Sequence, residues 1–147
     1  MAENIWAAES PDQSTAYLIV RLSNAHQRRI NNDLSPLGLT YSQFILLSGI
    51  RWLEYRNEQV TQVALGESVK FDKSTVSGVL KTLVGKKLVK RREHPADTRA
   101  KLLSLTSRGL AVLTEAMPVV DRADRALYQN KGVDLTVLND QLAKLME

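Results

Sequence analysis

Apolar residues recur at three- and four-residue spacing along most of the chain, which predicts a largely helical protein. Leu18, Leu22 and Ala25 follow this spacing and lie on one face of a helix expected from Pro11 to about Asp33. Proline suits the first turn of a helix because its missing N–H has no intrahelical partner there. The apolar face of this helix needs another element to cover it.

Three further helices are predicted to begin at capping residues. Thr40 opens a T-x-x-Q capping box before a helix that ends near Leu53. Thr61 and Asp72 have side chains suited to capping two more helices, the second ending near Lys86. This last helix has one apolar face, and the other face carries small, polar or basic residues: Ser74, Ser77, Gly78 and Lys81. A short helix, a turn and a helix with one polar face are typical of helix-turn-helix proteins, which insert the second helix into the major groove of DNA.

Two short strands are predicted next, at Leu88–Glu93 and Ala100–Leu105. The segment between them contains His94, expected as a solvated loop residue, and Pro95, which favours a turn. A hairpin placed directly after a helix-turn-helix is a wing.

The end of the chain predicts two helices that pack against other helices. The longer one follows Thr106, contains Pro118, where a kink is expected, and is expected to end at Lys131–Gly132. Both helices carry a seam with alternating three- and four-residue spacing. Its members are Leu110, Leu113, Met117, Val120 and Leu127 in the first helix, and Leu135, Leu138, Leu142 and Leu145 in the second.

These elements predict a mostly α-helical fold with a small β-wing, in which a winged helix-turn-helix is flanked by N- and C-terminal dimerisation helices. We expect a flexible N-terminus over residues 1–10, a dimerisation helix over 11–34, the DNA-binding domain over 35–105 and dimerisation helices over 106–147. Because the small central module cannot cover the apolar seams at both ends, two chains are expected to pair symmetrically. The alternative is a monomer that folds its own end helices together.

Charge is unevenly distributed along the chain. Residues 70–101 contain ten basic and three acidic side chains, a net charge of +7. The rest of the chain has a net charge of −3, so the total is +4. A local positive field attracts polyanions, and binding to them is strongly salt-dependent. The alternative interpretation is a solvated, solubilising surface.

Composition narrows the function classes further. At 147 residues the chain has the size of one domain, and it has no cysteine and only two histidines, which leaves no disulfide or thiolate zinc site and little for any metal. No apolar run approaches the roughly 20 residues of a membrane span. Met1–Asp12 lacks the basic and apolar regions of a secretion signal, so a cytoplasmic location is expected.

Three segments together resemble the MarR family of bacterial transcriptional regulators: Leu39–Phe44, Phe71–Ser77 and Asp97–Gly109. The resemblance runs from about Thr15 to the carboxyl end. It implies a triangular homodimer with the terminal helices at its apex and two winged modules on double-stranded DNA. It also implies a repressor of nearby genes that a small, often phenolic, ligand releases. The peroxide-sensing variant of the family requires cysteine and is excluded.

The resemblance also assigns roles to individual residues. It places Ser74, Thr75 and Ser77 in the major groove, and Arg99 in the minor groove with Asp97 orienting it. A narrow minor groove concentrates negative potential and favours arginine. The alternative for Asp97 and Arg99 is a salt bridge that only shapes the turn. Phosphate contacts are expected from Lys73, Lys81 and Arg92, with solvated charge as the alternative.

Gly78 departs from the family pattern, because relatives frequently carry a basic residue there. Its absence removes a candidate for bidentate recognition of guanine. Close approach of the backbone to DNA is one possible compensation, so the bases that are recognised stay open.

An effector pocket between the dimerisation helices and the winged module is implied as well. Candidates for its lining are His26 as a titratable ring, Arg21 as a partner for a carboxylate and Trp52 as an aromatic wall. The alternatives are a histidine satisfied within a helix interface, an exposed arginine and a core tryptophan. No cofactor is expected.

Catalysis is not expected. The seven glycines form neither G-x-G-x-x-G nor a Walker loop, and no G-x-S-x-G elbow is present. The remaining alternative is a winged helix that binds proteins without sequence-specific DNA binding. The basic segment over residues 70–101 argues against it.

Overall fold

The computed structural model describes Met1 and residues 10–147. Its helices and strands occur in the order predicted from the sequence. They are the 3-10 turn η1 (Pro11–Gln13), α1 (Thr15–Leu34), the 3-10 turn η2 (Ser35–Leu37), α2 (Tyr41–Tyr55), α3 (Gln62–Val69), α4 (Lys73–Gly85), β1 (Val89–Glu93), β2 (Lys101–Leu105), α5 (Ser107–Tyr128) and α6 (Leu135–Lys144).

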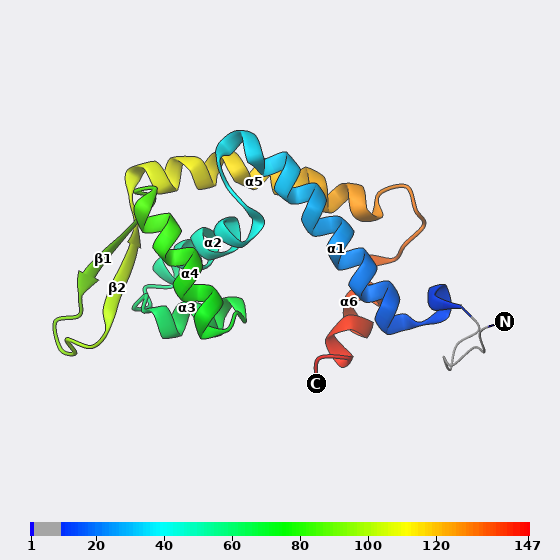
Figure 1. Ribbon diagram of the computed structural model, residues 1–147, viewed down its shortest axis with the longest axis horizontal. Helices are drawn as coiled ribbons and strands as arrows, with labels where there is room; N and C mark the ends of the chain where they lie inside the picture. The colour runs from blue at the N-terminus through cyan, green and yellow to red at the C-terminus, as the bar shows by residue number, and fades with distance from the viewer. Residues whose placement is uncertain (2–9) are drawn as a thin grey trace.

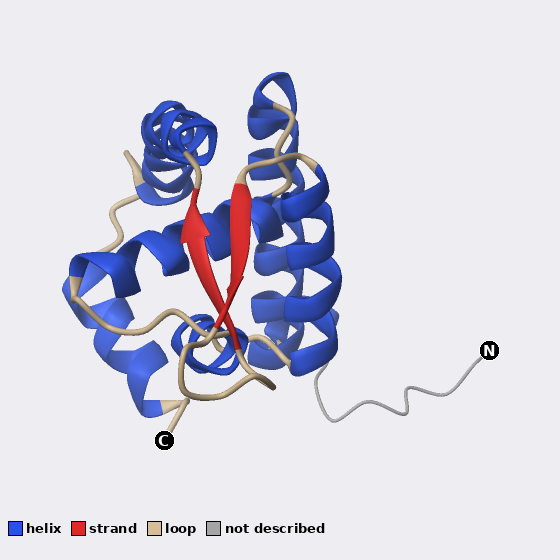
Figure 2. Cartoon of the chain, turned by 90° about the vertical axis from the view of Figure 1, so that its left-hand side faces the viewer, coloured by secondary structure: helices blue, strands red, loops and turns tan. Residues whose placement is uncertain are grey.

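The molecule is elongated, with the winged module at one end and the terminal helices at the other (Figure 1). Helices α2, α3 and α4 cluster beside the two-stranded sheet, and α5 runs from this cluster to the opposite end, where it lies along α1. Figure 2, viewed from the winged end, shows the two strands in front of the helices. The predicted mostly helical fold with a β-wing is confirmed.

Capping interactions start the helices where the sequence predicted. The Thr40 hydroxyl accepts a hydrogen bond from the Gln43 N–H, and the Gln43 side chain accepts one from the Thr40 N–H, which completes the capping box of α2. Thr61 caps α3 and Asp72 caps α4 in the same manner. Each cap satisfies a backbone donor that the first turn leaves without a partner.

One hydrophobic core holds the winged module to α5. It combines buried residues of α2, α4 and the strands with the buried face of α5, for example Leu47, Leu80, Leu103 and Leu113. The predicted apolar stripe of α4 is confirmed, because Val76, Leu80 and Leu83 are buried and Val79 and Val84 pack against the same core.

The first turn of α5 lies very close to Leu88, which is in the segment between α4 and β1. A Cβ atom on Gly109 would stand 2.0 Å from the carbonyl oxygen of Leu88, so only glycine fits. The Leu88 carbonyl also accepts the N–H of Thr106, and the Thr106 hydroxyl accepts the N–H of Gly109. The wing and α5 are therefore joined by backbone contact.

The wing is an antiparallel pair with Val89 opposite Leu105 and Glu93 opposite Lys101. Strand β2 is joined to the connector between α2 and α3, because the Leu103 N–H donates to the Val60 carbonyl at 2.8 Å and Thr61 forms a bridge with Leu102. Each strand begins one residue later than predicted.

The terminal helices leave apolar residues uncovered in the single chain. Leu18 and Leu22 of α1 are 44% and 53% exposed, and Leu138 and Leu142 of α6 are 39% and 40% exposed. No residue of α6 is buried. The face predicted for pairing is therefore present and open, although the other end of α1 packs against α5 within the chain.

Three sequence expectations need correction. The first helix does not start at Pro11, because Ser14 is extended and caps a new helix by accepting the Tyr17 N–H. Helix α5 passes through Pro118 but ends at Tyr128, since Gln129 is extended, before the predicted Lys131–Gly132. Trp52 is 53% exposed and does not belong to the core. The expectation of a flexible N-terminus falls on residues 2–9, which lie outside the described residues.

Candidate nucleic-acid interface

The exposed face of α4 contains the polar residues that the helix-turn-helix pattern singled out. Ser74, Ser77, Gly78 and Lys81 are one helical turn or two apart, and all four are exposed. A Cβ atom added to Gly78 would meet nothing within 4 Å among the described residues, so the helix surface there is flat. This face is free to contact a groove along its length.

The hydroxyls at the start of α4 are engaged with its capping residue. Asp72 accepts hydrogen bonds from the hydroxyls of Ser74 and Thr75 and from the N–H of Thr75, the last at 2.9 Å. The Ser74 hydroxyl first, and then the Thr75 hydroxyl and N–H, hold the pKa of the Asp72 carboxyl far below its usual range. Asp72 is therefore ionised, and its charge suits the helix N-terminus.

The hydrogen bonds to Asp72 show that Ser74, Thr75 and Ser77, which were predicted to have the same role, differ in the availability of their hydroxyls. The Ser74 and Thr75 hydroxyls donate to Asp72, and Thr75 is half-buried. Ser77 lies one turn further on, exposed, with no hydrogen bond from its hydroxyl to the described residues. Ser77 is thus the hydroxyl on this face whose donor is free for a DNA base.

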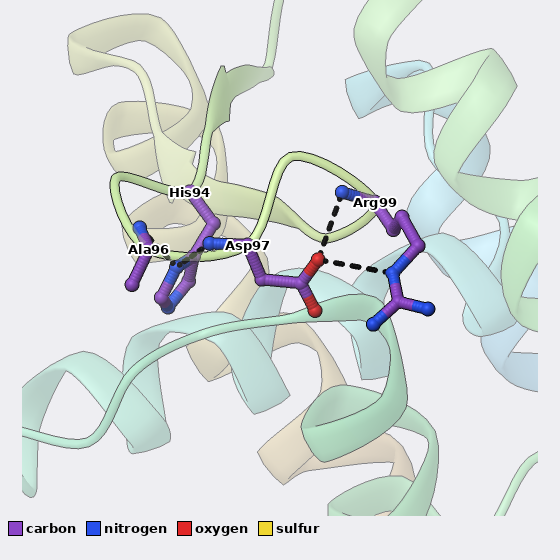
Figure 3. Close-up of polar contacts among 4 residues, drawn as sticks. All are labelled: His94, Ala96, Asp97 and Arg99. Atoms are coloured by element: carbon purple, nitrogen blue, oxygen red, sulfur yellow. Dashed lines mark hydrogen bonds and ion pairs between the residues drawn. The ribbon is translucent and has the colours of Figure 1, made fainter.

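Arg99 projects from the wing with 92% of its side chain exposed, and it forms an ion pair with Asp97 (Figure 3). Asp97 Oδ1 accepts the Arg99 backbone N–H at 3.0 Å and the Nε–H at 3.3 Å. The two terminal nitrogens of the guanidinium have no hydrogen-bond partner among the described residues and can donate outward. The pair shapes the turn and leaves the cation exposed, which is compatible both with a minor-groove contact and with a salt bridge that only shapes the turn.

The wing tip and the start of α4 face each other across a shared cavity of about 620 Å³. Lys73 of α4 and Arg99 of the wing both line it, and α3 forms its floor through Gly66 and Glu67. Two of the predicted DNA contacts from separate elements are therefore brought together. Arg92 is exposed on β1 opposite Leu102, and Lys81 is exposed two turns along α4.

His94 has a structural role that the sequence did not indicate. Instead of a solvated loop residue it is half-buried, and its ring contacts the side chain of Gln59 and the backbone of Ala96 and Asp97. Its position after a strand and before Pro95 gave no signal for this role, because the residues that commonly accept N–H groups of a turn are Asn, Asp, Ser and Thr.

The three candidates for an effector pocket lie apart in the chain. His26 of α1 contacts Asp124 of α5 at 2.8 Å, which is the satisfied interface histidine of the alternative interpretation. Arg21 is exposed, pairs with Asp12 and lies over the ring of Tyr17. Trp52 is on α2, in another cavity. The three side chains therefore do not line one pocket in the single chain.

Tyr41 joins the His26 contact. Its ring stands edge-on to His26, with the centroids 6.4 Å apart, and stacks on Phe44. Burial raises the pKa of the Tyr41 phenol, and the negative charge of Asp124 raises it further. The phenol is therefore neutral at physiological pH and stays available as a donor.

Trp52 lines a cavity of about 630 Å³ between α2 and α5. Its ring stacks on Tyr55, with the centroids 6.0 Å apart, and the guanidinium of Arg56 lies over it. The buried Oγ of Ser48 also faces this region and has no hydrogen-bond partner among the described residues. The other lining residues are Arg51, Leu110, Leu113, Thr114 and Met117.

Two further observations concern the described residues only. No three His, Asp or Glu side chains come close enough to hold a metal ion. None of the helices combines the length and apolar character that a membrane crossing requires.

Comparison with known proteins agrees with this geometry. The model of the MarR family matches residues 37–100. The chain is 33% identical over 118 residues to the uncharacterized HTH-type transcriptional regulator YdcH of Bacillus subtilis, and this match covers 80% of each protein. Its fold matches a mutant MarR from Escherichia coli complexed with operator DNA, with a TM-score of 0.79 at 28% identity over 90% of this chain and 93% of that one.

A second solved structure is similar over nearly its full length. The PcaV transcriptional regulator from Streptomyces coelicolor, in complex with its natural ligand, has a TM-score of 0.80 and 25% identity over 96% of each chain. The winged module, the basic segment and these relatives agree on one family. The chain belongs to the MarR family of DNA-binding transcriptional regulators.

Proposed function

We propose that this regulator binds a pseudo-palindromic operator as a homodimer and represses neighbouring genes until a small aromatic ligand releases it. The main support for this proposal is the cavity that Lys73 and Arg99 both line. Because the start of α4 and the wing tip lie on either side of it, both can contact the same DNA duplex. The two α4 helices of a dimer would then meet half-sites about 10 base pairs apart, centre to centre.

Pairing is proposed through the terminal helices over residues 11–34 and 106–147, with residues 35–105 as the DNA-binding domain. The support is the set of exposed apolar side chains on α1 and α6, which water would otherwise cover at unfavourable free energy. Light scattering after gel filtration tests it. A monomer at micromolar concentration would remove the fixed spacing on which operator binding depends.

Contacts with DNA divide by type. We assign base contacts to the α4 face, chiefly Ser77 with support from Ser74 and Thr75, and the minor groove to Arg99 oriented by Asp97. Phosphate contacts fall to Lys73, Lys81 and Arg92, whose charges position the protein without recognising sequence. Substitutions of Ser77 and Lys73 separate the two classes.

The ligand is proposed to bind in the cavity that Trp52 lines. Stacked Trp52 and Tyr55 offer an aromatic wall, Arg51 offers a cation for a carboxylate, and the Ser48 hydroxyl lacks a partner. Because α2 belongs to the winged module and α5 continues to the terminal helices, an occupant between them would alter the angle of the module. The solved PcaV complex supports ligand response in a protein of this fold.

The deciding experiment selects bound DNA from a random pool at moderate salt, with and without simple phenolic acids. An enriched palindrome that the acids displace supports the proposal, and Trp52→Phe should weaken the displacement more than the DNA binding. Absence of any enriched sequence would favour a winged helix that binds proteins instead.

We also infer that the chain acts by binding and not by catalysis, since its relatives are transcriptional regulators. A regulator of bacterial genes meets DNA in the cytoplasm, and we propose that location. No cofactor enters the proposed mechanism.

A further inference from the structure

The imidazole of His94 closes the turn at the wing tip. Its Nδ1 accepts the N–H of Ala96 at 3.1 Å and the N–H of Asp97 at 3.2 Å (Figure 3). The backbone N–H of His94 donates to the Ala100 carbonyl at 3.3 Å, across the same turn. Pro95 has no N–H of its own. The Nδ1 atom of His94 therefore accepts the first two backbone N–H groups of the turn that precedes Arg99.

The opposite side of the ring reaches a different element. His94 Nε2 lies 2.9 Å from Oε1 of Gln59, in the connector between α2 and α3. The next residue, Val60, accepts the N–H of Leu103 at 2.8 Å, so this connector is already paired with β2. His94 thus ties the wing tip to a backbone segment that the core supports.

These contacts require one protonation state of the ring. A backbone N–H can only donate, so Nδ1 must keep its lone pair to accept from Ala96 and Asp97. The ring proton then resides on Nε2, where it meets the acceptor Oε1 of Gln59. The other neutral tautomer, and the imidazolium, would direct a hydrogen at two N–H groups.

The charged groups nearby are engaged with each other. Glu93 pairs with Lys101, and Asp97 pairs with Arg99, so these four charges form two neutral pairs. The partner of the ring from the connector, Gln59, is uncharged. These nearby charges are therefore paired, and the hydrogen bonds of the ring to Gln59 and to two backbone N–H groups match its neutral state.

We propose that His94, as the neutral Nε2–H tautomer, is a positioning residue for Arg99. By fixing the backbone N–H of Asp97 it fixes the carboxylate that holds the Arg99 guanidinium. His94 itself need not touch DNA. The proposal rests on the role proposed for Arg99 and adds the residue on which that role depends.

Binding of the selected palindrome by four variants tests the proposal. His94→Phe keeps a ring without donor or acceptor. It should weaken binding about ten-fold, which corresponds to about 1.4 kcal/mol, and Arg99→Ala should weaken binding to the same extent. His94→Asn retains an acceptor for the turn N–H groups and should stay within about three-fold of wild type. Thr98→Ala, an exposed residue of the same turn, is the matched control and should bind as wild type.

The double variant His94→Phe with Arg99→Ala separates positioning from general damage. If His94 acts through Arg99, the double variant binds no more weakly than Arg99→Ala alone. Additive losses would overturn the proposal, as would wild-type binding by His94→Phe alongside weak binding by Arg99→Ala. Wild-type binding by Arg99→Ala would instead overturn the proposed wing contact itself.

A measurement on the free protein is independent of DNA. Long-range proton–nitrogen spectra of the two histidines, assigned with His94→Asn, should show the Nε2–H tautomer for His94 at neutral pH. The Arg99 Nε–H signal should be visible in wild type and lost to exchange in His94→Phe. An Nδ1–H tautomer, or an unchanged Arg99 signal, would overturn the proposal.

Discussion

His26 Nε2 lies 2.8 Å from Asp124 Oδ1, a contact that joins α1 to α5 across 98 positions of the chain. The His26 side chain is only 16% exposed, whereas Asp124 is 48% exposed. The edge of Tyr41 completes the cluster from α2. Three helices that connect the terminal region with the winged module therefore meet at one polar contact.

Asp124→Asn tests how this cluster is balanced. Because burial is the larger cause and the charge of Asp124 the smaller, the pKa of the Tyr41 phenol should fall in this variant but remain above its usual value. Stability should decrease by no more than about 1 kcal/mol, since the contact is partly solvated. The phenol is followed by NMR, with Tyr41→Phe for assignment. An unchanged pKa would remove Asp124 as a cause.

Asp72→Asn tests the electrostatics of the α4 cap. The pKa of Asp72 is lowered in the folded chain, so its stabilising effect is complete above the ordinary carboxyl pKa of about 3.9 and is lost as pH falls through the folded value. Asparagine caps helices without titrating in this range. The difference in urea midpoint between wild type and variant should be constant near neutral pH and shrink in acid. A difference that does not vary with pH would contradict the lowered pKa.

Replacing two glycines by alanine should have opposite effects on stability. Gly109→Ala should destabilise by about 1–3 kcal/mol, because the new methyl group collides with the Leu88 carbonyl. Gly78→Ala should stabilise by about 0.5–1 kcal/mol, since it adds a better helix former on an open surface. Chemical denaturation measures both, and equal effects would refute the close contact at Gly109.

The same Gly78→Ala variant also examines approach to DNA. If the α4 backbone approaches the duplex closely at Gly78, the methyl group should weaken binding although the protein is more stable. Binding equal to that of wild type would show that the flat surface is not used for close contact. The measurement is titration of the selected palindrome at fixed salt.

Ser77→Ala and Lys73→Ala should have different effects on DNA binding. Loss of the free Ser77 hydroxyl should alter base preference more than total affinity, whereas loss of Lys73 should weaken all sequences alike and reduce the salt slope by about one unit. Affinities for the palindrome and for unrelated DNA at several salt concentrations distinguish them. Identical changes of preference in both variants would refute the division between base and phosphate contacts.

Local patterns were sufficient for the order of the elements and for the starts of three helices. Thr40, Thr61 and Asp72 cap the helices that they were expected to cap, because a cap depends on atoms within three or four residues. The buried stripe of α4 follows similarly from periodicity. The helix ends were less accurate, since Gln129 leaves the helix by backbone geometry that residue type does not announce.

The candidate site was predictable in part. Asp97 and Arg99 are two residues apart, so their pairing follows from the turn itself. The unequal roles of Ser74, Thr75 and Ser77 did not follow, because they depend on which hydroxyl rotates toward Asp72. The alternative of a core tryptophan at Trp52 is wrong, since helical periodicity identifies an apolar face without showing whether another helix covers all of it.

The sequence alone was enough for the winged module and its basic charge, because capping, periodicity and net charge act over short distances, and the resemblance of three short segments indicated the family. Folding was needed to bring His26 to Asp124, His94 to Gln59 and Lys73 to the cavity of Arg99. These residues are separated by many positions, and no local rule specifies which distant partner a side chain meets. Their contacts arise only when the common core aligns the helices and the wing.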